Sequence, residues 1–418
     1  MLAAATRRNP APPLGVWKFL TRRRVVLVSL LLIASYLTFW LAWLLILAGV
    51  WPVPPESFPK IDFFAFLSAS SLSLDGAASS AYDAEKIWRE QMLLPGNDSG
   101  YHPWRNPPIF FFFVLPLSLL PVALSLIAWS AATGGLLLTA VRRISEHEMV
   151  PMLALAFPAT LWNLIIGQNG FLTAGLLAWG VLLLRDRPML AGVALGLMAY
   201  KPQFFPLVLV ALIAGGHRTS AVSAVLCVGV LSLASVPLFG LDSWDGFLSV
   251  VRASGDSIYG GGIELAKVQS VSAVILVMGL PALVAQAAQV AVAFVAVAFV
   301  AWLWRRDAPI AYKGAGLALG ILMATPYVYH YDLTLLGIAL LWLGAQIQKE
   351  GWSGGDAEVM VLAWLTPLSY PVLGFSIAPP VTLLLLAVLL RRVTSQQTSR
   401  LAESHLEPLE RQPEFRIR

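Results

Sequence analysis

Apolar runs separated by short polar breaks extend along almost the whole chain. From Val25 to Leu390 they last about 15 to 25 residues each, and Gly, Pro or a few charged residues interrupt them. A run of this length can cross a bilayer as a helix, whereas the strands of a membrane barrel would alternate strictly. The pattern therefore predicts an all-α membrane protein of about twelve transmembrane helices. The predicted spans are residues 25–50, 119–141, 150–166, 170–184, 188–201, 203–215, 219–239, 282–304, 309–326, 332–347, 357–374 and 377–391.

Basic clusters between the runs indicate a topology. If the basic residues of 1–24 are cytoplasmic, the positive-inside rule also places the later basic turns there, at 142–143, 185–187, 217–218, 305–306, 349 and 391–392. Both termini are then cytoplasmic, and a long loop, 51–106, carries amphipathic helices on the outer face. Residues 264–279 are apolar enough to span. Counting them would move 305–306 outside, so we predict an outer-surface amphipathic helix there.

The predicted organisation has three parts. A cytosolic basic segment, 1–24, precedes a polytopic membrane domain, 25–392, and a polar, disordered cytosolic tail, 393–418, follows. With 58% hydrophobic and only 12% charged residues, the chain is not a soluble domain. Its net charge of +5 gathers at helix ends, which indicates topology rather than a nucleic-acid partner. The single cysteine, Cys227, allows no internal disulfide and no Cys-based metal site.

Under this topology, the polar residues with catalytic potential gather on one side. The cytoplasmic turns hold Arg, Lys, Asp and Glu, whereas the outer turns hold Gln, Asn, His and a Lys beside a Pro. An outward-facing site explains this division.

Asp62 is the first candidate, because a carboxylate just beyond a span meets protein, headgroups and water. That environment can tune its pKa toward a general base. The alternative is a helix N-cap, since Phe63 onward has a helical pattern. Sequence alone leaves both interpretations open.

Two outer turns supply further polar side chains. In the turn "GQNG", 167–170, Asn169 at a positive-φ position and the glycines fit a tight hairpin, while Gln168 can contact a sugar hydroxyl or only serve the turn. In "YKPQ", 200–203, Lys201 lies between apolar runs beside a helix-breaking Pro. This placement favours a phosphate ligand over a lysine that snorkels at a helix end.

Two histidines and an arginine complete the candidates. His330 in "YVYHYD" could bond a phosphate oxygen or move a proton, whereas its tyrosines fit an interfacial aromatic belt and Asp332 fits a helix cap. His102 and Arg105 end the long loop beside an apolar element that Pro116 and Pro121 must break, where a basic residue suits a lipid-linked anion. Their alternative is an interfacial Trp/Arg anchor.

Several familiar signatures are absent from the sequence. We find no Walker A loop, no dinucleotide-binding glycine pattern, no HExxH and no GxSxG. No cofactor is therefore predicted, and the chain has no nucleotide site to power transport.

The ordered motifs resemble those of a known family. They are "KIDFFAF", "SSAYDAEKIWREQ", "NPPIFFFFVLPLSLLP", "LIIGQNGFLTAGLLAWGVLLL", "LAGVALGLMAYKPQFFPLVLV" and "ATPYVYHYDLTLL", which cover roughly residues 20 to 345. The set is similar to family 87 glycosyltransferases of the GT-C superfamily, which include polyprenyl-phosphate-mannose-dependent mannosyltransferases. The Asp-Glu pair of other GT-C branches is absent, because Phe63 follows Asp62.

The resemblance implies a GT-C type helical bundle that transfers a hexose, mannose in the mycobacterial members, with inversion. The implied partners are a polyprenyl-phosphate sugar, a lipid or glycan acceptor and membrane lipids, and the site faces outward from a bacterial plasma membrane. Asp62 takes the place of the catalytic aspartate. Lys201, His330 and Arg105 are expected at the donor phosphate and Gln168, Asn169, Gln203 and His102 at sugar or acceptor. The family generally needs no metal.

Two other classes compete with this interpretation. A lipid or sugar transporter would also have interrupted helices and an intramembrane lysine, but the broken elements near Pro116 and Pro202 have no matching repeat in the second half. A non-catalytic envelope scaffold does not account for polar residues gathered on one face.

Overall fold

The protein is almost entirely helical. The computed structural model describes residues 21–51, 61–94, 100–259 and 264–406, without the side chains of 254–257 and 396–406. It is 80% helical, and the described residues form no strand beyond one isolated antiparallel bridge between Val268 and Tyr329. The α-helices are α1 (Arg22–Leu47), α2 (Phe63–Leu74), α3 (Ala84–Met92), α4 (Phe111–Val114), α5 (Val122–Ile144), α6 (Met149–Ala156), α7 (Pro158–Ile166), α8 (Gly170–Leu183), α9 (Pro188–Leu197), α10 (Phe205–Ala214), α11 (Arg218–Phe239), α12 (Asp242–Tyr259), α13 (Val271–Val277), α14 (Ala282–Arg305), α15 (Ile310–Ala324), α16 (Thr334–Glu350), α17 (Asp356–Leu365), α18 (Ser369–Leu373) and α19 (Ala378–Leu406). Short 3₁₀ turns join them, of which η3 (Ala78–Tyr82), η6 (Met198–Tyr200), η7 (Leu265–Lys267), η8 (His330–Leu333) and η9 (Thr366–Leu368) are used below.

Five described helices are long and apolar enough to cross a membrane: α1, α5, α11, α14 and the first part of α19. The pair α6 and α7, bent by 58° where Pro158 begins the second helix, makes a sixth if it is counted as one span. A helical membrane protein is thus confirmed, but the count of twelve spans is not. Pro and Gly divide several of the other apolar runs into helices of 10–17 residues.

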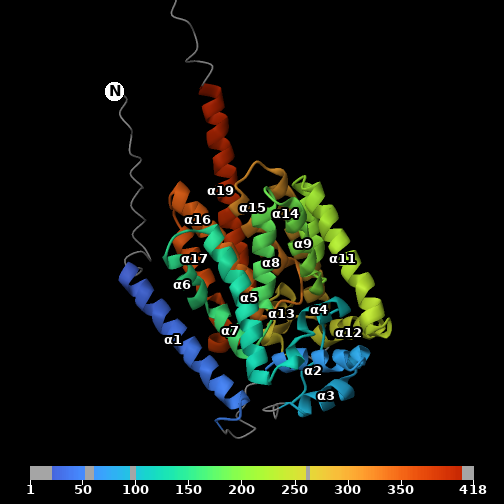
Figure 1. The fold of residues 1–418 in the computed structure, drawn as a ribbon. Helices are drawn as coiled ribbons and strands as arrows, with labels where there is room; N and C mark the ends of the chain where they lie inside the picture. Colours follow the sequence, from blue (N-terminus) through green and yellow to red (C-terminus); the bar gives the residue numbers. More distant parts are fainter. Residues whose placement is uncertain (1–20, 52–60, 95–99, 260–263, 407–418) are drawn as a thin grey trace, which may run out of the picture.

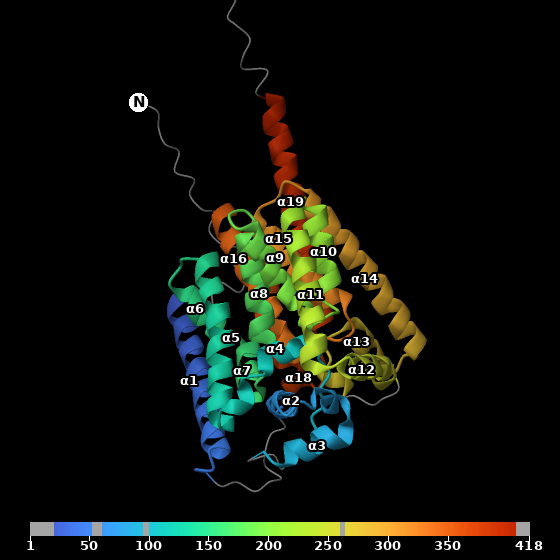
Figure 2. The ribbon, with the colours of Figure 1, turned by 45° about the vertical axis from the view of Figure 1, so that its right-hand side comes forward.

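The short helices form the interior of the bundle. Helices α8 and α15 are buried along most of their length, as expected of helices that are apolar all round. Helix α8 packs on α5 and α9, and α15 packs on α14 and α16. The long spans α1 and α11 lie on the periphery, with only 11% and 17% of their apolar windows buried (Figure 2).

Helices α2 and α3 lie at one end of the bundle, beside α12 (Figure 1). Helix α2 is buried on almost every side, and Phe66 packs edge-on against Trp104, Phe110 and Trp129. It is therefore not the amphipathic helix expected in the long loop. Helix α3 has that character, because Ile87 is buried while Trp88 is exposed.

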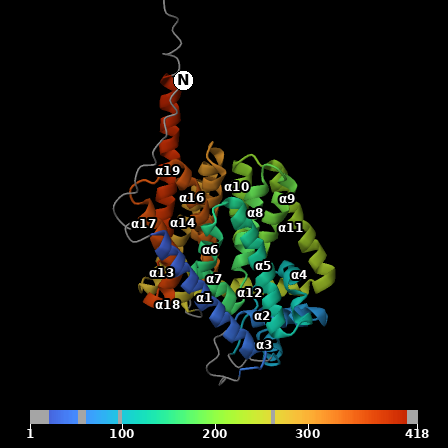
Figure 3. The same ribbon diagram turned by 60° about the vertical axis from the view of Figure 1, so that its left-hand side comes forward.

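Three C-terminal predictions differ from the structure. Residues 264–279 form η7, an extended piece that bridges Tyr329, and the seven-residue α13, so they are neither a span nor one amphipathic helix. The predicted span 357–374 is broken into α17, η9 and α18, with Pro367 at the break. The predicted disordered tail begins as helix, since α19 continues to Leu406 and extends past the bundle (Figure 3). Residues 1–20 of the predicted N-terminal segment and 407–418 lie outside the described residues.

The end of the bundle opposite α2 is closed by an ion-pair cluster. The Asp356 side chain is fully buried at the start of α17 and pairs with both Arg391 and Arg392 of α19. Ser353 donates two further hydrogen bonds to it, at 2.8 and 2.9 Å. Both oxygens of this carboxylate thus accept hydrogen bonds within the protein, as a buried charge requires.

Candidate active site

Asp62 lies at the start of α2 with its carboxylate turned toward the bundle. It occupies the N-cap position, yet its side chain makes no capping hydrogen bond. Instead, Gln168 Nε2 donates to Asp62 Oδ2 at 2.8 Å, and His102 Nδ1 lies 3.4 Å from Oδ1. The side chain remains 43% exposed. The structure therefore uses this carboxylate for contacts across the fold and not for the cap.

The electrostatic surroundings keep Asp62 ionised. Burial disfavours the charged form, but the hydrogen bonds from His102 and Gln168 outweigh it and hold the pKa of the Asp62 carboxyl below its usual value. The distance to His102 is long for a hydrogen bond, so Gln168 is the better-formed contact.

The turn between α7 and α8 brings Gln168 against α2. Gly167 adopts a left-handed conformation, with φ of +65°, and a Cβ there would lie 2.6 Å from Phe63 Cβ. Only glycine allows both the turn and this close approach. The positive φ was predicted for Asn169, which instead has φ of −98°. The buried Asn169 side chain has no hydrogen-bond partner for Oδ1 among the described residues.

A second glutamine fixes His102. Gln91 of α3 is fully buried, donates from Nε2 to His102 O at 2.6 Å, and accepts from His102 N at 2.9 Å. This pair of bonds holds the backbone of His102 so that Nδ1 faces Asp62. The other ring nitrogen, Nε2, is buried and unpartnered within the described part of the chain.

His330 enters the same region from the turn between α15 and α16. Its ring lies 4.5 Å from the Trp162 ring, centroid to centroid, and stacks on Tyr370 at 6.1 Å. The backbone of Lys267 approaches the ring, but neither ring nitrogen has a hydrogen bond of good geometry to another described residue. Burial lowers the pKa of His330 to about 4, although the nearby Asp62 charge opposes this. The imidazole is therefore neutral at physiological pH.

Lys201 does not stand alone. Its ammonium group forms a buried ion pair with Asp332 of η8 and lies 5.2 Å from the centre of the Tyr331 ring. The other oxygen of Asp332 accepts from Tyr329 N at 3.1 Å. Asp332 thus serves as the predicted cap and, in addition, neutralises Lys201.

Arg105 is exposed and lies near Tyr329. Burial raises the pKa of the Tyr329 phenol, the Arg105 guanidinium group opposes this rise, and the Asp62 charge adds to it. Gln203, by contrast, is exposed, and the described residues show no contact between its side chain and the Asp62 network. Among the described residues, hydrogen-bond contacts join Asp62 to His102 and Gln168. His330 lies near enough to interact with the Asp62 charge, Arg105 lies near the Tyr329 phenol, and Lys201 is paired with Asp332.

Four residues around the site carried no sequence signal that singled them out. They are Gln91, Asn163, Thr173 and Tyr200. Asn163 joins the two halves of the chain, since Oδ1 accepts from Gly170 N at 2.8 Å and Nδ2 donates to Tyr331 O at 3.1 Å. Thr173 and Tyr200 share a hydrogen bond below the turn, at 2.5 Å. These contacts link residues between 7 and 168 positions apart, and none of them lies within one helix, so helical spacing could not reveal them.

The arrangement has the parts needed for proton abstraction beside an anion. An ionised carboxylate faces partly open space, and buried polar atoms of His102, Asn169 and His330 are left for a ligand. An exposed guanidinium group and a neutral imidazole are available to an anionic group. In the described residues, no group of three or more His, Cys, Asp and Glu side chains is placed to hold a metal ion.

A model of glycosyltransferase family 87 matches residues 104–326. The chain belongs to glycosyltransferase family 87. This family 87 glycosyltransferase has its Gln168, Lys201 and Arg105 inside the matched stretch, whereas Asp62, His102 and His330 lie outside it. No curated protein and no solved structure matches the chain.

Proposed function

We propose that this family 87 glycosyltransferase transfers a hexose, such as mannose, from a polyprenyl-phosphate sugar to an envelope lipid or glycan on the outer face of a bacterial plasma membrane. Asp62 serves as the general base. The observation that carries the proposal is the ionised, partly exposed Asp62 carboxylate amid buried polar atoms that have no partners among the described residues.

The chemistry follows from one displacement at the anomeric carbon. Asp62 accepts the proton of an acceptor hydroxyl as its oxygen bonds to C1 of the sugar. The C1–O bond to the phosphate breaks, and its electron pair leaves with the polyprenyl phosphate. Because attack and departure occur on opposite faces of C1, the anomeric configuration inverts.

Gln168 and His102 prepare Asp62 for this role. Gln168 fixes one oxygen, and His102, as the Nδ1–H tautomer, is near the other, so the carboxylate needs little reorganisation. The same two contacts also make Asp62 a weaker base. The base is therefore ionised at all physiological pH values, and its efficiency depends on position.

Negative charge grows on the departing phosphate and needs a counter-charge. Arg105 is exposed and suits a direct, bidentate phosphate contact. The neutral His330 can donate one hydrogen bond from its ring. Lys201 contributes from behind, because its charge is already shared with Asp332.

A membrane-bound donor suits this position. The site lies at one end of a bundle that contains several helices able to cross a membrane, so a lipid phosphate reaches it without leaving the bilayer. A soluble or lipid acceptor approaches from the same side.

The test is sugar transfer by the purified protein with a small panel of radiolabelled polyprenyl-phosphate sugars, including mannose and glucose. We expect product from the native chain and none from Asp62→Asn. The matched control is Asp75→Asn, an exposed aspartate at the other end of α2, which should behave as the native chain does.

The outcomes separate the alternatives. Product retained by Asp62→Asn would place the base elsewhere. Movement of an intact lipid-linked sugar across a vesicle membrane, with no transfer to any acceptor, would instead support a transporter.

A further inference from the structure

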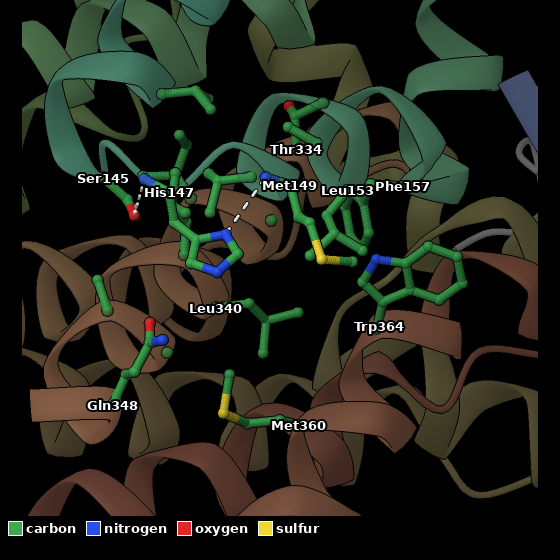
Figure 4. Close-up of a pocket in the computed structure, with 18 of the residues that line it drawn as sticks. Ser145, His147, Met149, Leu153, Phe157, Thr334, Leu340, Gln348, Met360 and Trp364 are labelled. Carbon is green, nitrogen blue, oxygen red and sulfur yellow. Dashed lines mark hydrogen bonds between the residues drawn. The ribbon is translucent and has the colours of Figure 1, made fainter. Parts of the chain in front are cut away.

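An elongated pocket lies away from Asp62, along α16. It encloses about 440 Å³ between α5 and α6 on one side and α16 and α17 on the other (Figure 4). Its walls are almost entirely apolar, with Leu153, Phe157, Leu340, Met360 and Trp364 among them. A pocket of this lining does not hold ordered water well, because water needs two to four polar partners.

The pocket is long, and its polarity is graded. Thr334 and Gln348 of α16 both line it, and their separation of 14 positions corresponds to about 21 Å of helix. Ser145, His147 and Gln348 gather at one end, while Phe157 and Trp364 lie at the other (Figure 4). A slot with one polar end and a long apolar interior has the polarity of a single lipid chain and its headgroup.

Charge at the polar end favours an anion. Arg142 and Arg143 precede Ser145, Lys349 follows Gln348, and all three are exposed and form no ion pair among the described residues. Of the three acidic residues beside them, Glu148 pairs with Arg22 and Glu350 with Arg392, which leaves Glu146. Basic groups around an opening between membrane helices are typical of sites for anionic lipid headgroups.

Two glycines of α16 keep the slot open. A Cβ at Gly337 would lie 2.9 Å from the Phe157 ring, and one at Gly344 would lie 3.2 Å from Met360 Cε. Both neighbours line the pocket. A larger side chain at Gly344 would therefore occupy part of the slot, with a flexible methionine able to give way.

We propose that this pocket binds one hydrocarbon chain of an anionic phospholipid, whose phosphate lies at the Ser145–His147–Gln348 end. The site is separate from Asp62 and does not depend on the proposed reaction. It places a lipid between the α5–α6 and α16–α17 pairs, at the end of the bundle closed by Asp356.

The test uses the full chain in phosphatidylcholine nanodiscs that contain a phosphatidylglycerol probe with a photoactivatable group on its acyl chain. We expect labelling to concentrate in peptides from 149–157 and 337–348. Labelling spread evenly over the exposed faces of α1, α11 and α14 overturns the proposal, and this result needs no variant.

A matched pair of variants sharpens the test. Gly344→Leu should reduce labelling of these peptides at least fivefold, whereas Gly229→Leu, on α11 with open space around it, should leave it unchanged. Undiminished labelling in Gly344→Leu would overturn the site. A phosphatidylcholine probe that labels as strongly as phosphatidylglycerol would overturn the anionic headgroup.

Discussion

The two ends of the bundle each hold an aspartate with several polar partners, yet the two sites differ in what remains unsatisfied. Asp356 is fully buried and pairs with Arg391, Arg392 and Ser353. Asp62 is 43% exposed, and within the described ranges no lysine or arginine forms an ion pair with it. A carboxylate saturated by arginines stabilises the fold, whereas one held by an amide and an imidazole keeps a lone pair for a substrate.

The largest effects should come from the same substitution, Asp to Asn, made at each end of the bundle. Asp62→Asn is expected to reduce kcat by about 10²–10⁴-fold with little change in unfolding temperature, because only the base is lost. Asp356→Asn is expected to destabilise the protein by about 3–5 kcal/mol, since it leaves Arg391 without a carboxylate partner among the described residues and the buried Arg392 with only its 3.5 Å contact to Glu350. Initial rates and thermal unfolding in detergent measure both. A large loss of stability in Asp62→Asn would remove the distinction.

A second effect concerns His330 and pH. Its pKa is about 4 when folded and about 6.5 when unfolded, so the unfolded chain binds a proton first as the pH falls. The stability that the neutral His330 contributes is therefore fully present above pH 6.5. It is lost between pH 6.5 and 4, by about 3 kcal/mol in total. The difference between native chain and His330→Gln, followed by denaturant unfolding over this range, isolates the contribution from that of the carboxylates. A pH-independent difference would contradict it.

A third comparison uses two buried glutamines. Gln91 holds the backbone of His102, and Gln289 holds Ser272 N and Met323 O in the same manner far along the chain. Loss of either pair of bonds should cost about 1–3 kcal/mol of stability. Only Gln91→Met should also lower kcat, by about tenfold, because a 1 Å misplacement near the reacting groups can cost far more than that. Equal kcat per folded molecule in both variants would show that the Gln91 contact is structural alone.

The smallest effect is expected at Gln203. Its exposed side chain stands apart from the Asp62 network, so Gln203→Ala should change kcat/KM by less than about twofold. Gln168→Ala removes the 2.8 Å bond to Asp62 and should lower the rate by about tenfold. Steady-state kinetics with one donor compares them directly. A larger loss at Gln203 would place an acceptor contact on the exposed turn.

The sequence allowed the helices and most of the candidate site residues to be predicted, but not which of these residues contact one another. Apolar runs located most of the helices but not the number of membrane spans, and the motif resemblance selected Asp62, Gln168 and His330. Asp62 lies 40 positions from its partner His102 and 106 positions from its partner Gln168, and no local periodicity encodes such contacts. The same limit applies to Lys201, whose partner Asp332 looked only like a cap. Span counting failed where a proline, such as Pro158, breaks an apolar run without a change in composition.

The Lys201–Asp332 pair also has a consequence for the order of synthesis. Asp332 follows Lys201 by 131 residues, so the lysine enters the membrane long before its counter-ion has been made. An unpaired lysine among apolar helices is costly, and the growing chain must expose it to water or to the insertion machinery until η8 arrives. The end of the bundle that holds Asp62 can therefore assemble only after the ribosome has synthesised the chain up to α16. Truncated chains that stop before this point keep an unpaired Lys201.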